Sequence, residues 1–140
     1  MAKQPIEPGI LLLPEGADRG VRLCASGCDD CGAIFHPRRR ICLACHGRRL
    51  RDTSLVGTGT LYACTRVAMP LRPGMRPERG YWVAQVDLDD GPRVQGLLAP
   101  DVAEPRIGMR LRLGVETVWV ADNGDEIVVH HFVAADEAAA

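Results

Sequence analysis

Four of the six cysteines form two closely spaced pairs, Cys28-x2-Cys31 and Cys42-x2-Cys45, with ten residues between the pairs. Each Cys-x2-Cys turn can place two sulfurs on one side of an ion, and two turns supply four thiolates, a ligand set that Zn²⁺ prefers. A site filled by four protein ligands leaves no position for water, so the spacing predicts one structural Zn²⁺ per chain. Unpaired thiols and a redox-active pair are the alternatives, and the occurrence of two pairs together favours the metal.

The remaining cysteines are weaker candidates for chemistry. Cys24 lies four residues before Cys28 and is an alternative ligand, but it lacks the two-residue spacing, so we expect it to be free. Cys64 lies in an apolar, strand-like run, where a buried thiol behaves as a small hydrophobic residue. A nucleophilic role for Cys64 would require a histidine and an acidic residue beside it.

The four histidines do not assemble a site in the sequence. His36 and His46 flank the cysteine pairs, and we expect them at the surface or around the ligands because four thiolates complete the coordination. His130 and His131 are adjacent in an expected strand, so their side chains point to opposite faces and cannot act together on one ligand. No set of nucleophile, base and open metal site emerges, and the sequence predicts no catalytic residues and no enzyme activity for the chain alone.

The composition is that of a globular protein of limited size. The chain has 140 residues, of which 46% are hydrophobic and 25% charged, and it contains no apolar stretch near the roughly 20 residues that span a bilayer. The first ten residues lack the basic and apolar regions of a signal peptide. These features favour a cytoplasmic protein with no membrane partner.

We expect four parts along the chain, with a mainly β fold. Residues 1–20 form an extended N-terminal arm, residues 21–52 a rubredoxin-like zinc ribbon, residues 53–135 an OB-fold, and residues 136–140 a disordered tail. A thin apolar lining of the ribbon is expected from Leu23, Ile34, Phe35, Ile41 and Leu50. Because so small a lining cannot hold a fold alone, the ribbon is expected to depend on its metal.

Five short strands are predicted in the second half, at residues 57–69, 80–88, 93–99, 109–115 and 126–133, because apolar residues alternate there between turn signals. Their core-facing residues are expected to be Leu61, Ala63 and Val67; Trp82, Ala84, Val86 and Leu88; and Met109, Leu111, Leu113 and Val115. A five-stranded OB-fold barrel closes so few strands without leaving exposed edges.

The order of motifs over about residues 22–134 resembles the zinc-ribbon plus OB-fold proteins that accompany thiolases. The resemblance rests on the cysteine pairs, on His36-Pro37-Arg38, on the segment Gly57 to Tyr62 and on the strand Tyr81 to Leu88. It implies a non-catalytic accessory subunit that forms a hetero-oligomer with a thiolase-like enzyme and binds or shields an acyl-CoA thioester. Partners of the CoA-ester hydratase or aldolase type are the alternatives within the family, and the small zinc-finger subunit of a benzoylsuccinyl-CoA thiolase is one similar protein.

Two departures from the family pattern bear on these implications. The second pair reads Cys-Leu-Ala-Cys-His where the family usually has Cys-Pro-x-Cys-Gly, which leaves the four ligands intact. The N-terminal helical hairpin of many members is reduced to the short arm. This difference weakens the inference of which class of enzyme is the partner.

The charge is strongly polarised along the chain. Residues 1–80 contain 13 Lys/Arg and 7 Asp/Glu, whereas residues 81–140 contain 4 and 11. Guanidinium groups present planar forks of donors to phosphate oxygens, so the arginines are candidates for binding CoA or a partner. These candidates are Arg38, Arg39, Arg40, Arg48, Arg49 and Arg51 in the ribbon, and Arg72, Arg76 and Arg79 in an expected mobile loop over residues 71–80, with Trp82 beside it. A solvated charged face is the alternative interpretation.

A nucleic-acid-binding function fits the sequence less well. A basic ribbon followed by an OB-fold favours it, but residues 53–140 carry 8 Lys/Arg against 12 Asp/Glu. Binding of single strands requires a positive groove with aromatic residues for stacking. We therefore expect weak or no nucleic-acid binding.

Overall fold

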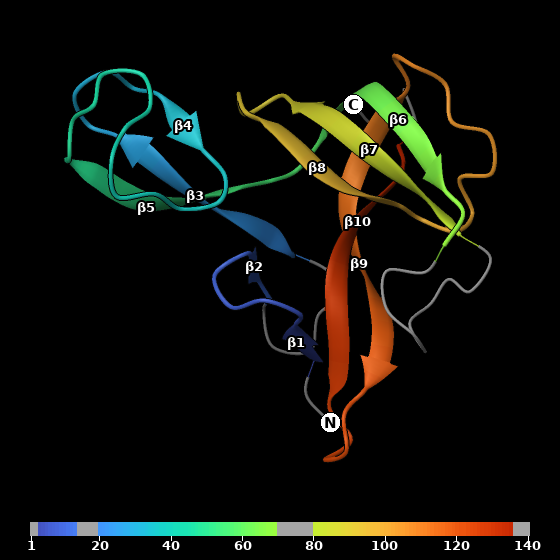
Figure 1. The fold of residues 1–140 in the computed structure, drawn as a ribbon. Coiled ribbons are helices and arrows are strands. Elements are labelled where there is room, and N and C mark those ends of the chain that lie inside the picture. The colour runs from blue at the N-terminus through green and yellow to red at the C-terminus, as the bar shows by residue number, and fades with distance from the viewer. Residues whose placement is uncertain (1–2, 14–19, 70–79, 136–140) are drawn as a thin grey trace.

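The computed structural model describes residues 3–13, 20–69 and 80–135, and all ten elements in those ranges are β-strands (Figure 1). The strands are β1 (Lys3–Pro5), β2 (Leu11–Leu12), β3 (Arg22–Cys28), β4 (Ile34–Phe35), β5 (Leu50–Leu55), β6 (Gly59–Val67), β7 (Tyr81–Leu88), β8 (Arg93–Leu98), β9 (Arg110–Val120) and β10 (Glu126–Ala134). The described residues contain no helix that could cross a membrane. Residues 1–2 and 14–19 of the predicted arm, residues 71–79 of the predicted mobile loop and the tail 136–140 lie outside the described residues, as does residue 70.

Five strands close into a barrel, as the sequence predicted. Around the barrel the order is β6, β7, β8, β10 and β9, and β9 returns to pair with β6. All neighbours are antiparallel except β8 and β10, which run parallel where His131 pairs with Leu97. This order, with one parallel pair between the third and fifth strands, is an OB-fold. The closing contact is short, because β6 and β9 pair only where Gly59 meets Leu111 and Thr60 meets Arg110.

Alternation of apolar residues places one face of each barrel strand in the core. In β7, Ala84, Val86 and Leu88 are buried, and in β9, Leu111 and Leu113 are buried, as predicted. The prediction for β6 is partly wrong: Leu61 is buried, but Ala63 pairs with Gln85 on the opposite face. A β-bulge between Leu61 and Ala63 inserts one residue and reverses the alternation, so Cys64 packs against the core in place of Ala63.

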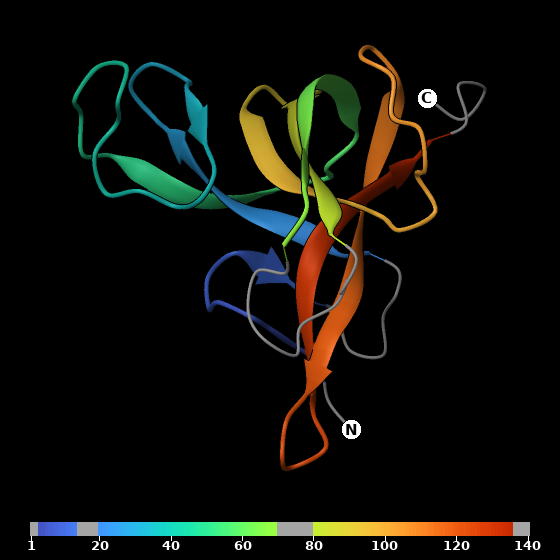
Figure 2. The same cartoon turned by 45° about the vertical axis from the view of Figure 1, so that its right-hand side comes forward.

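The N-terminal half forms a second, smaller sheet around β3. β3 pairs with β5 on one side, and with β2 and β4 on the other. The two strands of the N-terminal arm belong to different sheets. β2 pairs with β3 in the small sheet, whereas β1 pairs in parallel with the start of β10, near Glu126. There the β9–β10 hairpin projects beyond the barrel, as Figure 2 shows.

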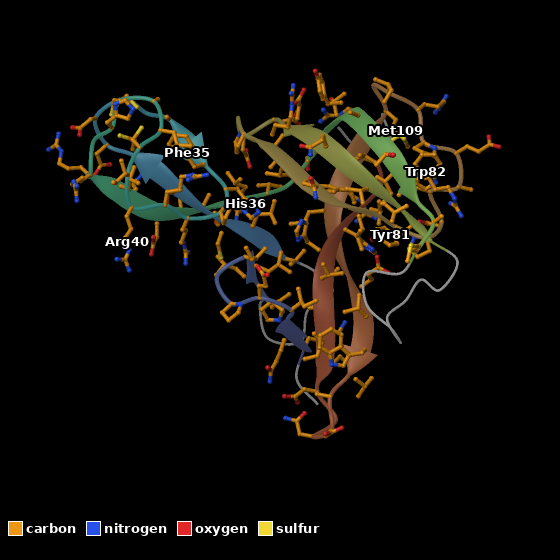
Figure 3. All side chains as sticks on the ribbon, in the orientation of Figure 1. Phe35, His36, Arg40, Tyr81, Trp82 and Met109 are labelled. Carbon is orange, nitrogen blue, oxygen red and sulfur yellow. The ribbon has the colours of Figure 1, made fainter. Side chains whose placement is uncertain are left out.

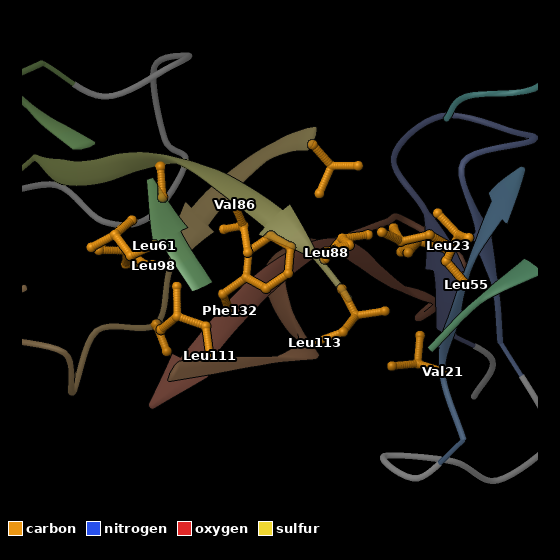
Figure 4. Packing of buried hydrophobic residues seen from close by; sticks show 14 of the residues in the cluster. Val21, Leu23, Leu55, Leu61, Val86, Leu88, Leu98, Leu111, Leu113 and Phe132 are labelled. Carbon is orange, nitrogen blue, oxygen red and sulfur yellow. The ribbon is translucent and has the colours of Figure 1, made fainter. Parts of the chain in front are cut away.

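The base of the small sheet and the barrel share one hydrophobic core. Leu23 of β3 and Leu55 of β5 are 0% and 2% exposed, and they belong to the same buried cluster as Leu88 and Leu113 of the barrel (Figure 4). Gly57 carries the chain from one sheet to the other. A Cβ on Gly57 would lie 2.5 Å from the Cβ of Leu113, so only glycine fits this crossing.

Candidate metal centre and barrel pocket

The four predicted ligands are brought together at the end of the small sheet. The Sγ atoms of Cys28, Cys31, Cys42 and Cys45 all lie within 4.8 Å of one another, so the group can hold a metal ion. Sγ of Cys28 is 3.7 Å from Sγ of Cys45, and Sγ of Cys31 is 3.5 Å from Sγ of Cys42. Sulfurs about 2.3 Å from a tetrahedral ion are about 3.8 Å apart, so the spacing fits a four-thiolate site.

Backbone hydrogen bonds fix both cysteine turns. In the first turn, the N–H of Gly32 donates to the carbonyl of Cys28, and in the second the N–H of His46 donates to the carbonyl of Cys42. Sγ of Cys42 accepts from the N–H groups of Ala44, at 3.3 Å, and Cys45, at 3.4 Å. These hydrogen bonds, of which the one from Cys45 has the largest effect, lower the pKa of the Cys42 thiol to about 7. They favour the thiolate form that binds a metal.

The other two cysteines lie outside this group. Cys24 is 1% exposed within β3, where burial raises the pKa of its thiol and keeps it protonated. Cys64 is partly buried against the barrel core. Neither side chain joins the cluster of four sulfurs among the described residues.

The structure divides the ribbon arginines into two groups. Three of them form ion pairs, Arg38 with Asp52, Arg49 with Asp30, and Arg51 with Asp29. The other three, Arg39, Arg40 and Arg48, have no carboxylate partner among the described residues and are exposed. Arg72, Arg76 and Arg79 lie outside the described residues.

A pocket of about 380 Å³ opens on the barrel at the start of β7. Its lining is mostly apolar and consists of Arg66, Gly80, Tyr81, Trp82, Leu98, Ala99, Pro100, Val102, Ala103 and Glu116. The side chain of Glu116 is 9% exposed, and its Oε1 lies 3.3 Å from Nδ1 of His131, whose side chain is 11% exposed. The pocket therefore presents one buried hydrogen-bonding group in an apolar wall.

The predicted site residues do not gather in one place. Arg40 in the ribbon and Trp82 at the pocket lie on opposite sides of the molecule, as Figure 3 shows. The arginine-rich ribbon and the aromatic residues of β7 are therefore two separate surfaces of one chain. Any ligand that reaches both would have to pass over the barrel or over a partner.

Two side-chain pairs in the structure were not predicted from the sequence. Glu116 and His131 are 15 residues apart, and their pairing depends on the register of β9 with β10. His36, from the ribbon, meets His130 of the barrel with ring centroids 6.2 Å apart. Alternation correctly assigned His130 and His131 to opposite faces but carries no information on their partners.

Comparisons with known proteins agree with this architecture. Residues 53–116 match the family OB_ChsH2_C, described as ChsH2, C-terminal OB-fold domain. A protein of Methanocaldococcus jannaschii described as a DUF35 domain-containing scaffold protein is 28% identical over 114 residues, which cover 77% of each chain. A chain in the solved structure of the Ltp2-ChsH2(DUF35) aldolase is 30% identical with a TM-score of 0.59, and the match covers 82% of this chain and 86% of that one. By this likeness over most of both chains, the protein belongs to the ChsH2/DUF35 family.

Proposed function

We propose that this chain is a non-catalytic accessory subunit of an enzyme that forms or breaks carbon–carbon bonds in acyl-CoA thioesters, of the thiolase-like or aldolase type. The observation that carries the proposal is the 30% identity with a chain of the Ltp2-ChsH2(DUF35) aldolase. The archaeal relative is named a scaffold protein, which supports a role in assembly. The acyl-CoA substrate class follows from the resemblance of the sequence motifs to the thiolase-associated proteins.

The arrangement of polar side chains supports a non-catalytic role. In residues 3–13, 20–69 and 80–135, the rings of His36 and His130 hydrogen-bond to backbone carbonyls and that of His131 to Glu116. No hydrogen bond in these ranges joins a histidine ring to a serine, threonine or cysteine side chain. Nucleophilic catalysis requires a nucleophile within reach of a base. In this proposal the partner subunit supplies the reacting groups.

The pocket beside Trp82 supports a part in shielding the thioester. Apolar walls from Tyr81, Trp82 and Leu98 would exclude water from an acyl or pantetheine segment, and the carboxylate of Glu116 would accept a hydrogen bond from an amide or hydroxyl group. Exclusion of water protects a thioester from hydrolysis while the partner acts on it.

We propose Zn²⁺ as the metal of the four-cysteine site. The two sulfur–sulfur distances match tetrahedral thiolate coordination, and with four protein ligands the ion would be structural. Bound there, Zn²⁺ would hold the two turns of the ribbon together and take no part in the reaction.

A nucleic-acid-binding role has less support. Tyr62 is an exposed aromatic residue on the barrel, but the guanidinium of Arg93 lies 3.4 Å from its ring centroid and is itself held by Asp87. The ring is thus covered on one face and does not form an open platform for a base. The acidic barrel would also repel a phosphate backbone.

Co-purification and kinetics test the proposal. The tagged chain, expressed in its native cell, should recover an enzyme subunit of the thiolase or aldolase type, identified by mass spectrometry. That subunit should lose most of its acyl-CoA activity when separated from the chain and regain it on recombination. Trp82→Ala should leave the complex intact but lower kcat, because water reaches the thioester. Tyr62→Ala, an aromatic truncation outside the pocket, serves as the matched control.

Two results would overturn this function. Recovery of ribosomal or replication proteins in place of an acyl-CoA enzyme would favour the nucleic-acid alternative. An enzyme subunit that is fully active alone would show that the chain is not needed for the reaction.

A further inference from the structure

The second cysteine turn carries an exposed surface that neither the metal nor the pocket uses. We call this surface the ribbon tip, and it consists of Arg39, Arg40, Ile41, Leu43 and Arg48. We propose that the ribbon tip docks onto the enzyme subunit, at an apolar patch of that subunit surrounded by aspartate and glutamate side chains. This inference rests on the proposed accessory function and assigns the surface that carries it out.

The charge of the ribbon tip has no counterpart within the described chain. The neighbouring arginines 38, 49 and 51 pair with aspartates of the same ribbon, whereas Arg39, Arg40 and Arg48 have no carboxylate partner among the described residues. Figure 3 shows the side chain of Arg40 extending away from the sheet. Three guanidinium groups without a carboxylate partner, on the segments that flank the second cysteine turn, therefore favour an acidic surface as the partner.

Two exposed apolar residues stand between Arg40 and Arg48 in the sequence. Ile41 was expected to line the ribbon interior, but that expectation is wrong, because it is 42% exposed. Leu43, between the two cysteines of the turn, is 58% exposed. Exposed apolar side chains together with arginines are typical of a protein–protein contact, in which a few such residues carry most of the binding energy.

The turn is held rigidly in place. The N–H of Cys42 donates to the carbonyl of Gly47, and this bond brings Arg48 alongside Ile41. The backbone of Arg39 is bonded to Ser26, since its N–H donates to Oγ of Ser26 and its carbonyl accepts from it. A surface fixed in this way loses little conformational entropy on binding.

This composition fits a protein better than it fits a phosphate group or a nucleic acid. Phosphate groups are bound by hydrogen-bond donors, and aliphatic side chains offer none. Single-stranded nucleic acid is bound by aromatic rings on which its bases stack. The exposed side chains of Ile41 and Leu43 instead favour an apolar partner surface, because contact with it removes them from water. The ribbon tip is also remote from the pocket at Trp82, so it does not extend that site.

The ribbon tip is smaller than a stable interface. Standard protein–protein contacts bury about 800 Å² on each partner, more than five side chains provide. We therefore assign the ribbon tip as the anchor of a larger contact face. Truncation or charge reversal at an anchor weakens binding far more than the same change at the periphery.

Matched variants of the full chain test the assignment. Leu43→Asp and Arg40→Glu are compared with Val120→Asp and Arg112→Glu, which change an equally exposed valine (61%) and an exposed arginine on β9. Each purified variant is titrated against the purified enzyme subunit that co-purifies with the wild-type chain. Leu43→Asp should weaken binding at least about 30-fold and Arg40→Glu about tenfold, whereas the β9 variants should bind within about twofold of the wild type.

Further readouts separate this inference from the function on which it rests. Affinity of the wild type should fall as salt rises, and less steeply for Arg40→Glu. Equal binding by the ribbon-tip and β9 variants overturns the docking surface while leaving the accessory function in place. An intact complex with a raised KM for acyl-CoA assigns the arginines to CoA and overturns it too. If the wild type binds a single-stranded DNA oligonucleotide or itself and the ribbon-tip variants lose only that binding, the docking surface is overturned and the accessory function is not.

Discussion

The imidazole rings of His36, in the ribbon, and His130, in β10 of the barrel, meet edge to face with their centroids 6.2 Å apart. Nδ1 of His36 donates to the carbonyl of Cys24 over 2.7 Å, and Nε2 of His130 donates to the carbonyl of Gln95 over 2.8 Å. Each ring is thus bound to its own sheet while facing the other. The pair forms part of the contact between the two halves of the molecule.

Acidification should weaken this contact. Burial lowers the pKa of both His36 and His130 below the usual value of 6.5, although the carbonyl bond of each opposes the shift. Below pH 6.5 the unfolded chain therefore binds more protons than the folded chain. The free energy of unfolding should fall as the pH drops through 6.5, and should stop falling below the pKa values of the folded state. Histidine titration by NMR should give both pKa values below 6.5.

The control is the pair of variants His36→Gln and His130→Gln, which should make the free energy of unfolding less dependent on pH between 7 and 5. Metal content has to be measured at each pH, since loss of a metal would also destabilise the ribbon. A pKa at or above 6.5 for both rings would contradict the proposed burial of the neutral pair.

Gly57 should be far less tolerant of substitution than another glycine with the same backbone conformation. Gly57 has φ +87° and a Cβ there would lie 2.5 Å from the Cβ of Leu113, whereas Gly108 has φ +92° with no atom within 4 Å. Gly108→Ala should cost about 1 kcal/mol of stability for the backbone alone. Gly57→Ala should cost about 1–3 kcal/mol more because Leu113 has to move. Urea unfolding of both variants checks the difference, and equal costs would exclude the predicted clash.

The strands could be predicted because their signals are local. Alternating apolar residues placed all five barrel strands to within a few residues, except that β9 continues to Val120, beyond the expected end at residue 115. The bulge in β6 could not be predicted, because it depends on the register with β7 and not on the composition of β6. One inserted residue reversed the facing of Ala63 and Cys64.

The candidate sites also differ in how far local sequence determines them. The cysteine cluster follows from two local turns, so spacing alone predicted it. The pairing of the arginines depends on Asp29, Asp30 and Asp52, which reach their partners only once β3 and β5 are aligned. The pocket takes residues from four separate segments, and its one buried carboxylate, Glu116, has no distinguishing sequence context.

The pair of Glu116 and His131 should stabilise the barrel through its hydrogen bond. Both side chains are largely buried, with Oε1 of Glu116 3.3 Å from Nδ1 of His131. Glu116→Leu removes the acceptor and leaves a buried ring nitrogen without a partner, which should cost about 1–3 kcal/mol. Glu116→Gln keeps an acceptor oxygen at the same place and should recover most of that loss. Urea unfolding measures the stability of both variants. Equal losses would mean that side-chain shape, and not the hydrogen bond, accounts for the contribution of Glu116 to the free energy of unfolding.

The last prediction concerns the metal. Purified chain should contain one Zn²⁺, because four sulfurs within 4.8 Å form a complete tetrahedral set. Cys42→Ser should abolish binding, since it removes the sulfur that accepts two backbone N–H groups. Cys24→Ser is the matched control: it changes a cysteine of the same sheet that lies outside the cluster, so it should retain the full metal content.

Loss of the ion should affect the two halves of the chain unequally. The ribbon depends on ligands from two turns, whereas the barrel contributes most of the shared core, including Val86, Leu111 and Phe132. Structural Zn²⁺ in small domains contributes about 10–16 kcal/mol of apparent binding free energy, which such a thin sheet cannot replace. Chelation should therefore speed amide exchange in residues 22–55 and leave the barrel strands protected. Iron or no metal in the purified chain, or uniform exchange after chelation, would contradict a structural zinc confined to the ribbon.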